Sequence, residues 1–242
     1  MSHLQNTFIR PSSLTPAVRM GLSISVATGL YGISFGALAV AAGLSIWQTM
    51  ALSALMFTGG SQFAFIGVIA GGGAGSAALG AATLLGVRNA VYGMQMNRML
   101  QPKGWRKYLA AQVTIDESAA TASGQIDAAE QSRGFWTAGV GVFVLWNVFT
   151  FVGAWLGDAL GDPRQWGLDG AAVAAFLGLL WPRLQQREPV ALAVLCGVLT
   201  ALAVPLLAPG LPILVAAVVG AAWGWWRSAV AQTAGLSTEE AL

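Results

Sequence analysis

The longest stretch without Asp, Glu, Lys or Arg runs from Met20 to Val87, and it limits the chain to one kind of fold. One bilayer crossing needs roughly 20 apolar residues, so this stretch has room for about three crossings. Of the 242 residues, 56% are hydrophobic and 9% are charged, whereas soluble domains carry about 25% charged residues. The alternating pattern of a membrane β-barrel is missing from the sequence. The sequence therefore predicts an all-α polytopic membrane protein.

A glycine pair, Gly59 and Gly60, interrupts the second apolar segment within residues 57–62. Two glycines open a helix easily, but in a bilayer the freed backbone N–H and C=O groups need partners. Many secondary transporters bind substrate at the midplane through such discontinuous helices. We expect a break here, with Ser61 capping the restarted helix and with Gly59, Gly60, Ser61 and Gln62 at a substrate site. The alternative is that the glycines only permit close helix packing.

Two groups of charged residues interrupt the apolar pattern further along the chain. An Arg at membrane depth costs at least about 2.5–3.5 kcal/mol, so Arg88, followed by Asn89, should face protein, water or substrate. The alternative for Arg88 is that its side chain extends to the membrane surface. Asp116 and Glu117 are the candidates for its counter-charge or for a proton carrier; the alternative is that they form a solvated helix face.

The polar segments divide the chain into two membrane bundles. We expect a polar tail over 1–19, a first bundle over 20–97, a cytoplasmic loop over 98–134, a second bundle over 135–228 and a C-terminal tail over 229–242. About seven spanning helices are expected, near 20–43, 47–70, 75–96, 135–157 and 170–181, and twice within 189–226. Residues 50–62 and 170–182 are each interrupted at the same place, which suggests an inverted repeat.

Basic residues in short loops predict the orientation of the chain in the membrane. The cluster from Arg98 to Lys107, together with Arg227, is expected on the cytoplasmic side. Three full crossings before Arg98 would place the N-terminus outside, although Arg10 and Arg19 favour the inside. A re-entrant second segment would place it inside. Because the second segment is long enough to cross, we expect three crossings.

Residue types needed for several other function classes are scarce. Cys196 and His3 are the only cysteine and histidine, so neither a disulfide framework nor a metal cluster of these residues is expected. The sequence also offers no nucleotide-binding loop or redox centre, and its basic residues sit at segment ends. We therefore expect no cofactor, no enzymatic activity and no nucleic-acid binding.

Three motifs together resemble the AzlC family. They are Phe57-Thr-Gly-Gly-Ser-Gln-Phe-Ala-Phe65, Val87-Arg-Asn-Ala-Val-Tyr-Gly93 and Thr114-Ile-Asp-Glu117, and the resemblance covers roughly residues 15 to 230. It implies export of branched-chain amino acids across the bacterial cytoplasmic (inner) membrane, together with a small AzlD-like membrane subunit. Residues 158–242 match mainly by hydropathy. Family members often carry His after the Arg, so a role for that histidine does not transfer to Asn89.

This resemblance and the residues suggest how the substrate is held. Arg88 and the restarted helix suit the carboxylate of an amino acid, and Asp116 or Glu117 suits its ammonium group or a coupling proton. An ion gradient, most simply of protons, would supply the energy. The alternatives are a membrane enzyme acting on a lipid-linked substrate and a non-transporting scaffold subunit. The side-chain pocket is expected to be walled by Phe57, Phe63 and Phe65.

Overall fold

The computed structural model describes residues 14–160, 177, 180–181, 184–208 and 211–233, and within these ranges the regular structure is helical. Two described helices, α1 (Pro16–Ala41) and α7 (Ala128–Leu160), combine the length and the apolar composition needed to cross a bilayer. Thr15 caps α1, because its Oγ1 accepts a hydrogen bond from Val18 N at 3.5 Å.

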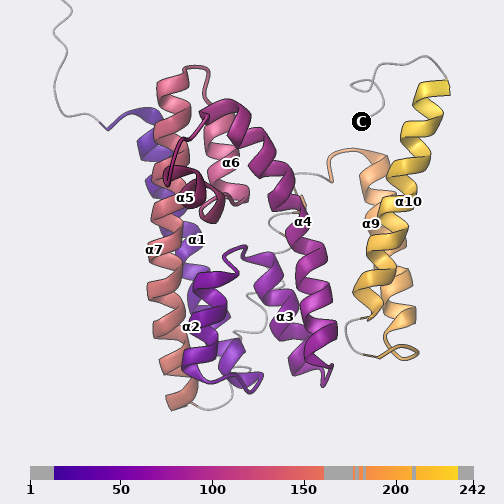
Figure 1. Cartoon of the computed structure of the whole chain (residues 1–242). Helices are drawn as coiled ribbons and strands as arrows, with labels where there is room; N and C mark the ends of the chain where they lie inside the picture. Colours follow the sequence, from indigo (N-terminus) through magenta and orange to yellow (C-terminus); the bar gives the residue numbers. More distant parts are fainter. Residues whose placement is uncertain (1–13, 161–176, 178–179, 182–183, 209–210, 234–242) are drawn as a thin grey trace, which may run out of the picture.

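Glycines bring α1 and α7 into close contact along their length (Figure 1). A side-chain carbon at Gly32 or Gly36 would collide with the backbone of Trp146 or Thr150, so only glycine permits this approach. Gly21 lies beside Ala138, and Gly36, further along α1, lies beside Thr150, further along α7. The residue numbers in contact rise together in both helices, so the two helices run parallel. Gly32 and Gly36 thus form a face of α1 that contacts α7 directly.

The chain between them first forms a helical hairpin. Helix α2 (Ile46–Leu55) runs from one end of the molecule to its middle, and α3 (Gly60–Ala70) returns to the same end (Figure 1). Ile69, near the end of α3, shares a hollow with Gly43 and Leu44, which precede α2. The expected break within residues 47–70 is confirmed.

The hairpin replaces the crossing that the sequence predicted. The halves of 10 and 11 residues measure about 15 Å each at 1.5 Å per residue, which is half the roughly 30 Å of a bilayer core. Helix α4 (Gly75–Leu100) then runs to the other end of the molecule. One traverse between α1 and α7 explains why those two helices are parallel.

A second hairpin enters from the opposite end. Helix α5 (Arg106–Gln112) and α6 (Asp116–Ser123) fill the half of the molecule that α2 and α3 leave open (Figure 1). The stretch 98–134 thus forms α5, α6 and the first turns of α7. The connections inside the two hairpins meet near mid-height, where Arg88 of α4 contacts both Thr58 and Asp116.

Helices α9 (Arg187–Ala203) and α10 (Leu211–Thr233) form a further hairpin, and α10 contacts α4. Glu188 joins their ends, because its Oε1 lies 2.7 Å from Arg227 Nε and accepts a hydrogen bond from Trp223 Nε1 at 3.1 Å. These are the two helices expected within 189–226. The helix expected over 170–181 lies outside the described residues except for three positions. The expected repeat of residues 50–62 by residues 170–182 lies outside them for the same reason.

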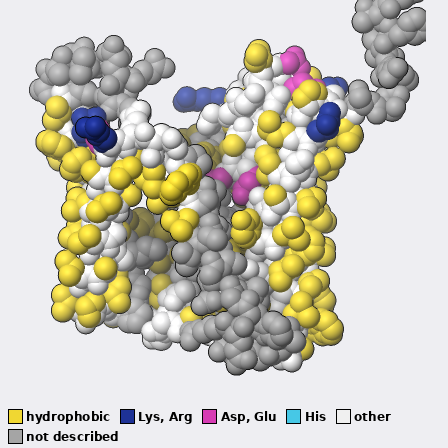
Figure 2. Space-filling model, turned by 180° about the vertical axis from the view of Figure 1, so that it is seen from behind, with side chains coloured by type: hydrophobic (Ala, Val, Ile, Leu, Met, Phe, Trp, Pro, Cys, Tyr) yellow, Lys and Arg dark blue, Asp and Glu magenta, His cyan; other side chains and the backbone are white. Residues whose placement is uncertain are grey.

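Charge is concentrated at one end of the molecule. Figure 2 shows the Lys and Arg side chains of one face gathered toward that end, while hydrophobic side chains cover much of the rest. This is the end at which α1 begins and α4 finishes, so Arg19 and Arg98 lie on the same side.

Candidate functional site

Glutamine side chains stabilise the break between α2 and α3. The Nε2 of Gln62 donates to Leu52 O at 3.2 Å and to Ser53 O at 3.1 Å, and Gln112 Nε2 donates to Ala54 O at 2.8 Å. Leu52 O also accepts from Met56 N at 3.0 Å, whereas the carbonyls of Ser53 and Ala54, in the last turn of α2, have no partner within the helix. Gln62 is fully buried and does not line the pocket described below, so its position in the structure is that of a helix cap.

Gly59 begins α3 in a conformation that favours glycine. Its φ of 60° and ψ of −83° lie outside the regions that L-residues ordinarily adopt, and its carbonyl accepts from Gln62 N at 3.0 Å. The prediction that Ser61 caps α3 is wrong, because Gly59 occupies the N-cap and Ser61 lies inside the first turn. Ser61 is buried and faces Gly86 of α4.

A cavity of about 180 Å³ lies where the two hairpins meet. It brings together five of the eight site residues expected from the sequence, Gly59, Gly60, Arg88, Asp116 and Glu117, whereas Ser61, Gln62 and Asn89 stay outside its lining. One side is polar and the other is apolar. The cavity is lined by Thr28, Tyr31, Phe57, Thr58, Gly59, Gly60, Phe63, Arg88, Ile115, Asp116, Glu117, Val142 and Trp146.

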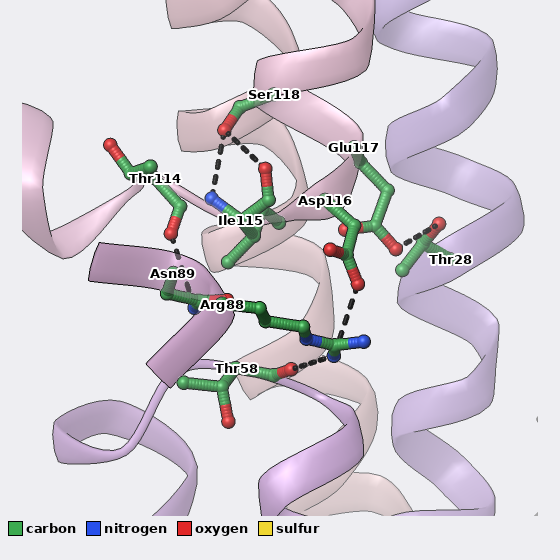
Figure 3. A network of polar contacts seen from close by, with 9 residues as sticks. All are labelled: Thr28, Thr58, Arg88, Asn89, Thr114, Ile115, Asp116, Glu117 and Ser118. Atoms are coloured by element: carbon green, nitrogen blue, oxygen red, sulfur yellow. Dashed lines mark hydrogen bonds and ion pairs between the residues drawn. The ribbon is translucent and has the colours of Figure 1, made fainter. Parts of the chain in front are cut away.

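The polar side centres on an ion pair between α4 and α6 (Figure 3). Arg88 Nη2 lies 3.0 Å from Asp116 Oδ2 and donates to Thr58 O at 3.4 Å. The side chains are 33% and 21% exposed, so Arg88 faces the cavity and its extension to the membrane surface is not observed. Only half of the pair is satisfied, because Arg88 Nε and Asp116 Oδ1 are buried without a hydrogen-bond partner among the described residues.

Glu117 lies beside this pair but faces α1 (Figure 3). Thr28 Oγ1 donates to Glu117 Oε1 at 3.5 Å, which is a long contact. Glu117 stands in the first turn of α6, outside the helices long enough to span a bilayer. Burial, with a smaller contribution from Asp116, raises the pKa of the Glu117 carboxyl above its ordinary value of 4.5, against the opposing effects of Arg88 and hydrogen bonds. Asp116 and Glu117 both line the cavity, so they do not form the solvated helix face that was the alternative.

Side chains hold the connection between α5 and α6 through hydrogen bonds to its backbone (Figure 3). Asn89 Nδ2 donates to Thr114 O at 3.3 Å. Ser118 Oγ donates to Val113 O at 2.7 Å and accepts from Ile115 N at 3.0 Å. Asn89 thus holds the loop that leads into α6, and α6 begins with Asp116. Its link to the cavity is through this loop and not through direct contact.

The sequence profile described as AzlC protein matches residues 23–160, which is more than half of the chain. The chain belongs to the AzlC family. This family is associated with the transport of branched-chain amino acids across membranes. No curated protein and no solved structure gave a significant match. All the cavity residues of this AzlC protein lie inside the matched range, whereas α9 and α10 lie beyond it.

The apolar side of the AzlC cavity contains residues that the sequence did not single out. Phe57 and Phe63 line it as expected, but Phe65 lies in the hollow between α2 and α3. Val142 and Trp146, one turn apart on α7, complete this wall. The only sequence feature that could have indicated these two residues is their four-residue spacing on an apolar helix. Every helix in a protein core shows this spacing, so it does not identify a binding site.

Proposed function

We propose that this AzlC protein is a secondary transporter that exports branched-chain or similar neutral amino acids, and that the cavity at the meeting point of the hairpins is its substrate site. The observation that carries the proposal is the two-sided lining. Charged groups of both signs, Arg88 and Asp116, lie on one side, and aromatic and aliphatic side chains lie on the other. A neutral amino acid with an aliphatic side chain presents the same combination of groups.

The half-satisfied ion pair supports binding of a zwitterion. The buried Nε–H of Arg88 can donate to a carboxylate, and the buried Oδ1 of Asp116 can accept from an ammonium group. A zwitterion inserted between them satisfies both atoms without leaving a net charge in the cavity. A ligand with only one of the two charges leaves one buried atom unpaired, which costs roughly 1–3 kcal/mol.

The size and lining of the apolar side support a small aliphatic side chain. The cavity of about 180 Å³ is many times the roughly 10–15 Å³ that one water molecule needs on the same measure. Phe57, Val142 and Trp146 offer no hydrogen-bonding side-chain group there apart from the indole Nε1 of Trp146. Burying an aliphatic side chain against them contributes about 1.5–3 kcal/mol.

The arrangement of the hairpins supports transport by a multi-pass protein of the inner membrane. Two re-entrant hairpins that enter from opposite faces and meet at the midplane are typical of transporters built from inverted repeats. The positive-inside rule places the basic end in the cytoplasm. The first turn of α1 then also lies on the inner side, which agrees with Arg19 and with the re-entrant alternative.

Glu117 is the group that we assign to proton coupling. Its raised pKa allows the carboxyl to take up a proton without breaking the pair between Arg88 and Asp116. A small AzlD-like membrane subunit is the proposed partner, as the family membership implies.

Transport by purified protein in liposomes tests the proposal. The protein, alone and together with the small subunit, is assayed for uptake of radiolabelled leucine, isoleucine and valine under an imposed proton gradient. We expect saturable transport that stops when the gradient is collapsed by a protonophore. Transport only with the subunit present, but lost in Arg88→Ala, still supports a site in this chain. Transport that survives Arg88→Ala unchanged would assign the site to the partner and make this chain a scaffold.

A further inference from the structure

A group of buried polar side chains lies behind the cavity and is not part of its lining. Thr49 and Ser53 of α2, Gln62 of α3 and Thr150 of α7 are all fully buried. Ser53 Oγ donates to Thr150 Oγ1 at 3.4 Å, a long contact that joins α2 to α7. We call these four residues the hydroxyl–amide cluster.

The cluster has more polar atoms than it can satisfy. Thr49 Oγ1 and Gln62 Oε1 are buried and have no hydrogen-bond partner within the described ranges. Such atoms are expensive in a protein interior, and more so at membrane depth, unless water or another polar group reaches them. At Thr49 an apolar residue of similar size would fit without this cost. Thr49 Oγ1 and Gln62 Oε1 can each accept a hydrogen bond from water or from a polar group that enters the cluster.

Three aromatic rings separate the cluster from the cavity. Phe63 and Trp146 line the cavity, and Phe35 lies behind them, fully buried. The ring centroids are 5.7 Å apart for Phe35 and Phe63, 5.9 Å for Phe35 and Trp146, and 6.2 Å for Phe63 and Trp146. Contacts between rings at these distances exclude water.

The order of residues along the helices places the cluster beyond the rings. Thr150 follows Trp146 by one turn of α7, on the same face of the helix. Along α2, Ser53 and Thr49 lead away from the break toward Ser45, which is exposed at the end opposite the basic residues (Figure 1). The cavity, the rings and the cluster thus follow one another from mid-height toward that end.

We propose that the hydroxyl–amide cluster is a second polar site on the transport path, filled by water and traversed by the charged groups of the amino acid once the three rings separate. The proposal rests on the proposed transport function, and it adds the route between the cavity and the non-basic end. In the present conformation the rings close this route.

Cysteine labelling tests the route without requiring any transport. Cys196, the only cysteine, is first changed to Ala, and Ser53→Cys and Thr150→Cys are then introduced separately. A charged methanethiosulfonate reagent modifies thiols that water reaches. Ser45→Cys, at the exposed end of α2, is the accessible control, and Ala81→Cys, fully buried between α3 and α4, is the inaccessible one.

The rings are then loosened by Phe63→Leu or, as a milder change, by Trp146→Phe. Because the labelling rate follows the fraction of protein in the open state, we expect both cluster cysteines to react about tenfold faster or more, with Ala81→Cys unchanged. Only variants that elute as a single species are compared. Unchanged labelling at both cluster positions, while Ser45→Cys reacts fully, would overturn the proposal. An equal acceleration at Ala81→Cys would also overturn it, because the rings would then stabilise the whole protein.

The result is separable from the failure of the proposed function. If leucine is not transported but the cluster cysteines become accessible, the route exists and the substrate is different. If leucine is transported but the cluster stays inaccessible, the transport function survives and this route does not.

Discussion

Gln62→Leu is the substitution that tests most directly how the break is held open. Leucine is close to glutamine in size but cannot donate to the carbonyls of Leu52 and Ser53. Ser53 O is then left unsatisfied, which costs roughly 1–3 kcal/mol, whereas Leu52 O keeps its hydrogen bond from Met56 N and its lost bond costs about 0.5–1.5 kcal/mol. The substitution also removes the unpartnered Oε1, which returns about 1–3 kcal/mol. The expected net loss of stability is about 0.5–1.5 kcal/mol.

Thermal unfolding of the purified protein in detergent, followed by loss of the monodisperse species, measures this effect. At about 2–4 °C per kcal/mol for a chain of this size, the Tm should fall by about 1–6 °C. Gln95→Leu is the matched control, because Gln95 makes one exposed hydrogen bond, to Ser123 Oγ at 3.2 Å. Its substitution should change stability by less than about 0.5 kcal/mol. A Gln62→Leu protein as stable as the control would refute the capping role.

Three further predictions concern the cavity. Gly59→Ala should lower stability by about 1–3 kcal/mol through backbone strain alone, because no atom lies within 4 Å of the added carbon; an unchanged Tm would show that the N-cap relaxes. Arg88→Ala should abolish leucine binding and leave the carboxylate of Asp116 without its counter-charge. If the double exchange Arg88→Glu with Asp116→Arg restores binding, then binding depends on the ion pair within the protein and not on contact between Arg88 and the substrate. The pKa of Glu117 is raised in the folded protein, so folding favours the protonated carboxyl. The stabilising contribution of Glu117 should therefore be fully present below pH 4.5 and be lost as the pH rises through the raised pKa. Glu117→Gln should remove that loss in unfolding measured across pH, and an identical pH profile in both proteins would exclude Glu117 as the titrating group.

The position of the break was predictable because it depends on local chemistry. Two adjacent glycines remove the steric restriction at Gly59, and the apolar segments around them are long enough to be recognised as helices. The direction in which α3 leaves the break was not predictable in the same way. It is set by packing of α3 against α4 and by the parallel contact of α1 with α7, and the second of these joins helices far apart in the sequence.

The partner of Arg88 was limited by sequence to few candidates, since the cost of an unpaired charge in a membrane requires a counter-charge. The structure brings Asp116 to Arg88 while Glu117 turns toward Thr28. Adjacent residues on a helix point about 100° apart, so only one of the two could face α4. Gln62 and Asn89 were predicted as substrate contacts, and in the structure their amides donate to backbone carbonyls instead. A buried amide that caps a helix or holds a loop looks the same in the sequence as one that binds a ligand.

Binding of leucine and its single-charge analogues to the purified protein, measured by isothermal titration calorimetry, tests the central claim. The account predicts that leucine binds, whereas leucinol, which lacks the carboxylate, and 4-methylpentanoate, which lacks the ammonium group, each bind at least about tenfold more weakly, because each leaves Arg88 or Asp116 half satisfied. Arg88→Lys should weaken leucine binding while leaving the affinity for leucinol unchanged. Equal affinities for leucine and leucinol would contradict the assignment of the cavity as an amino-acid site.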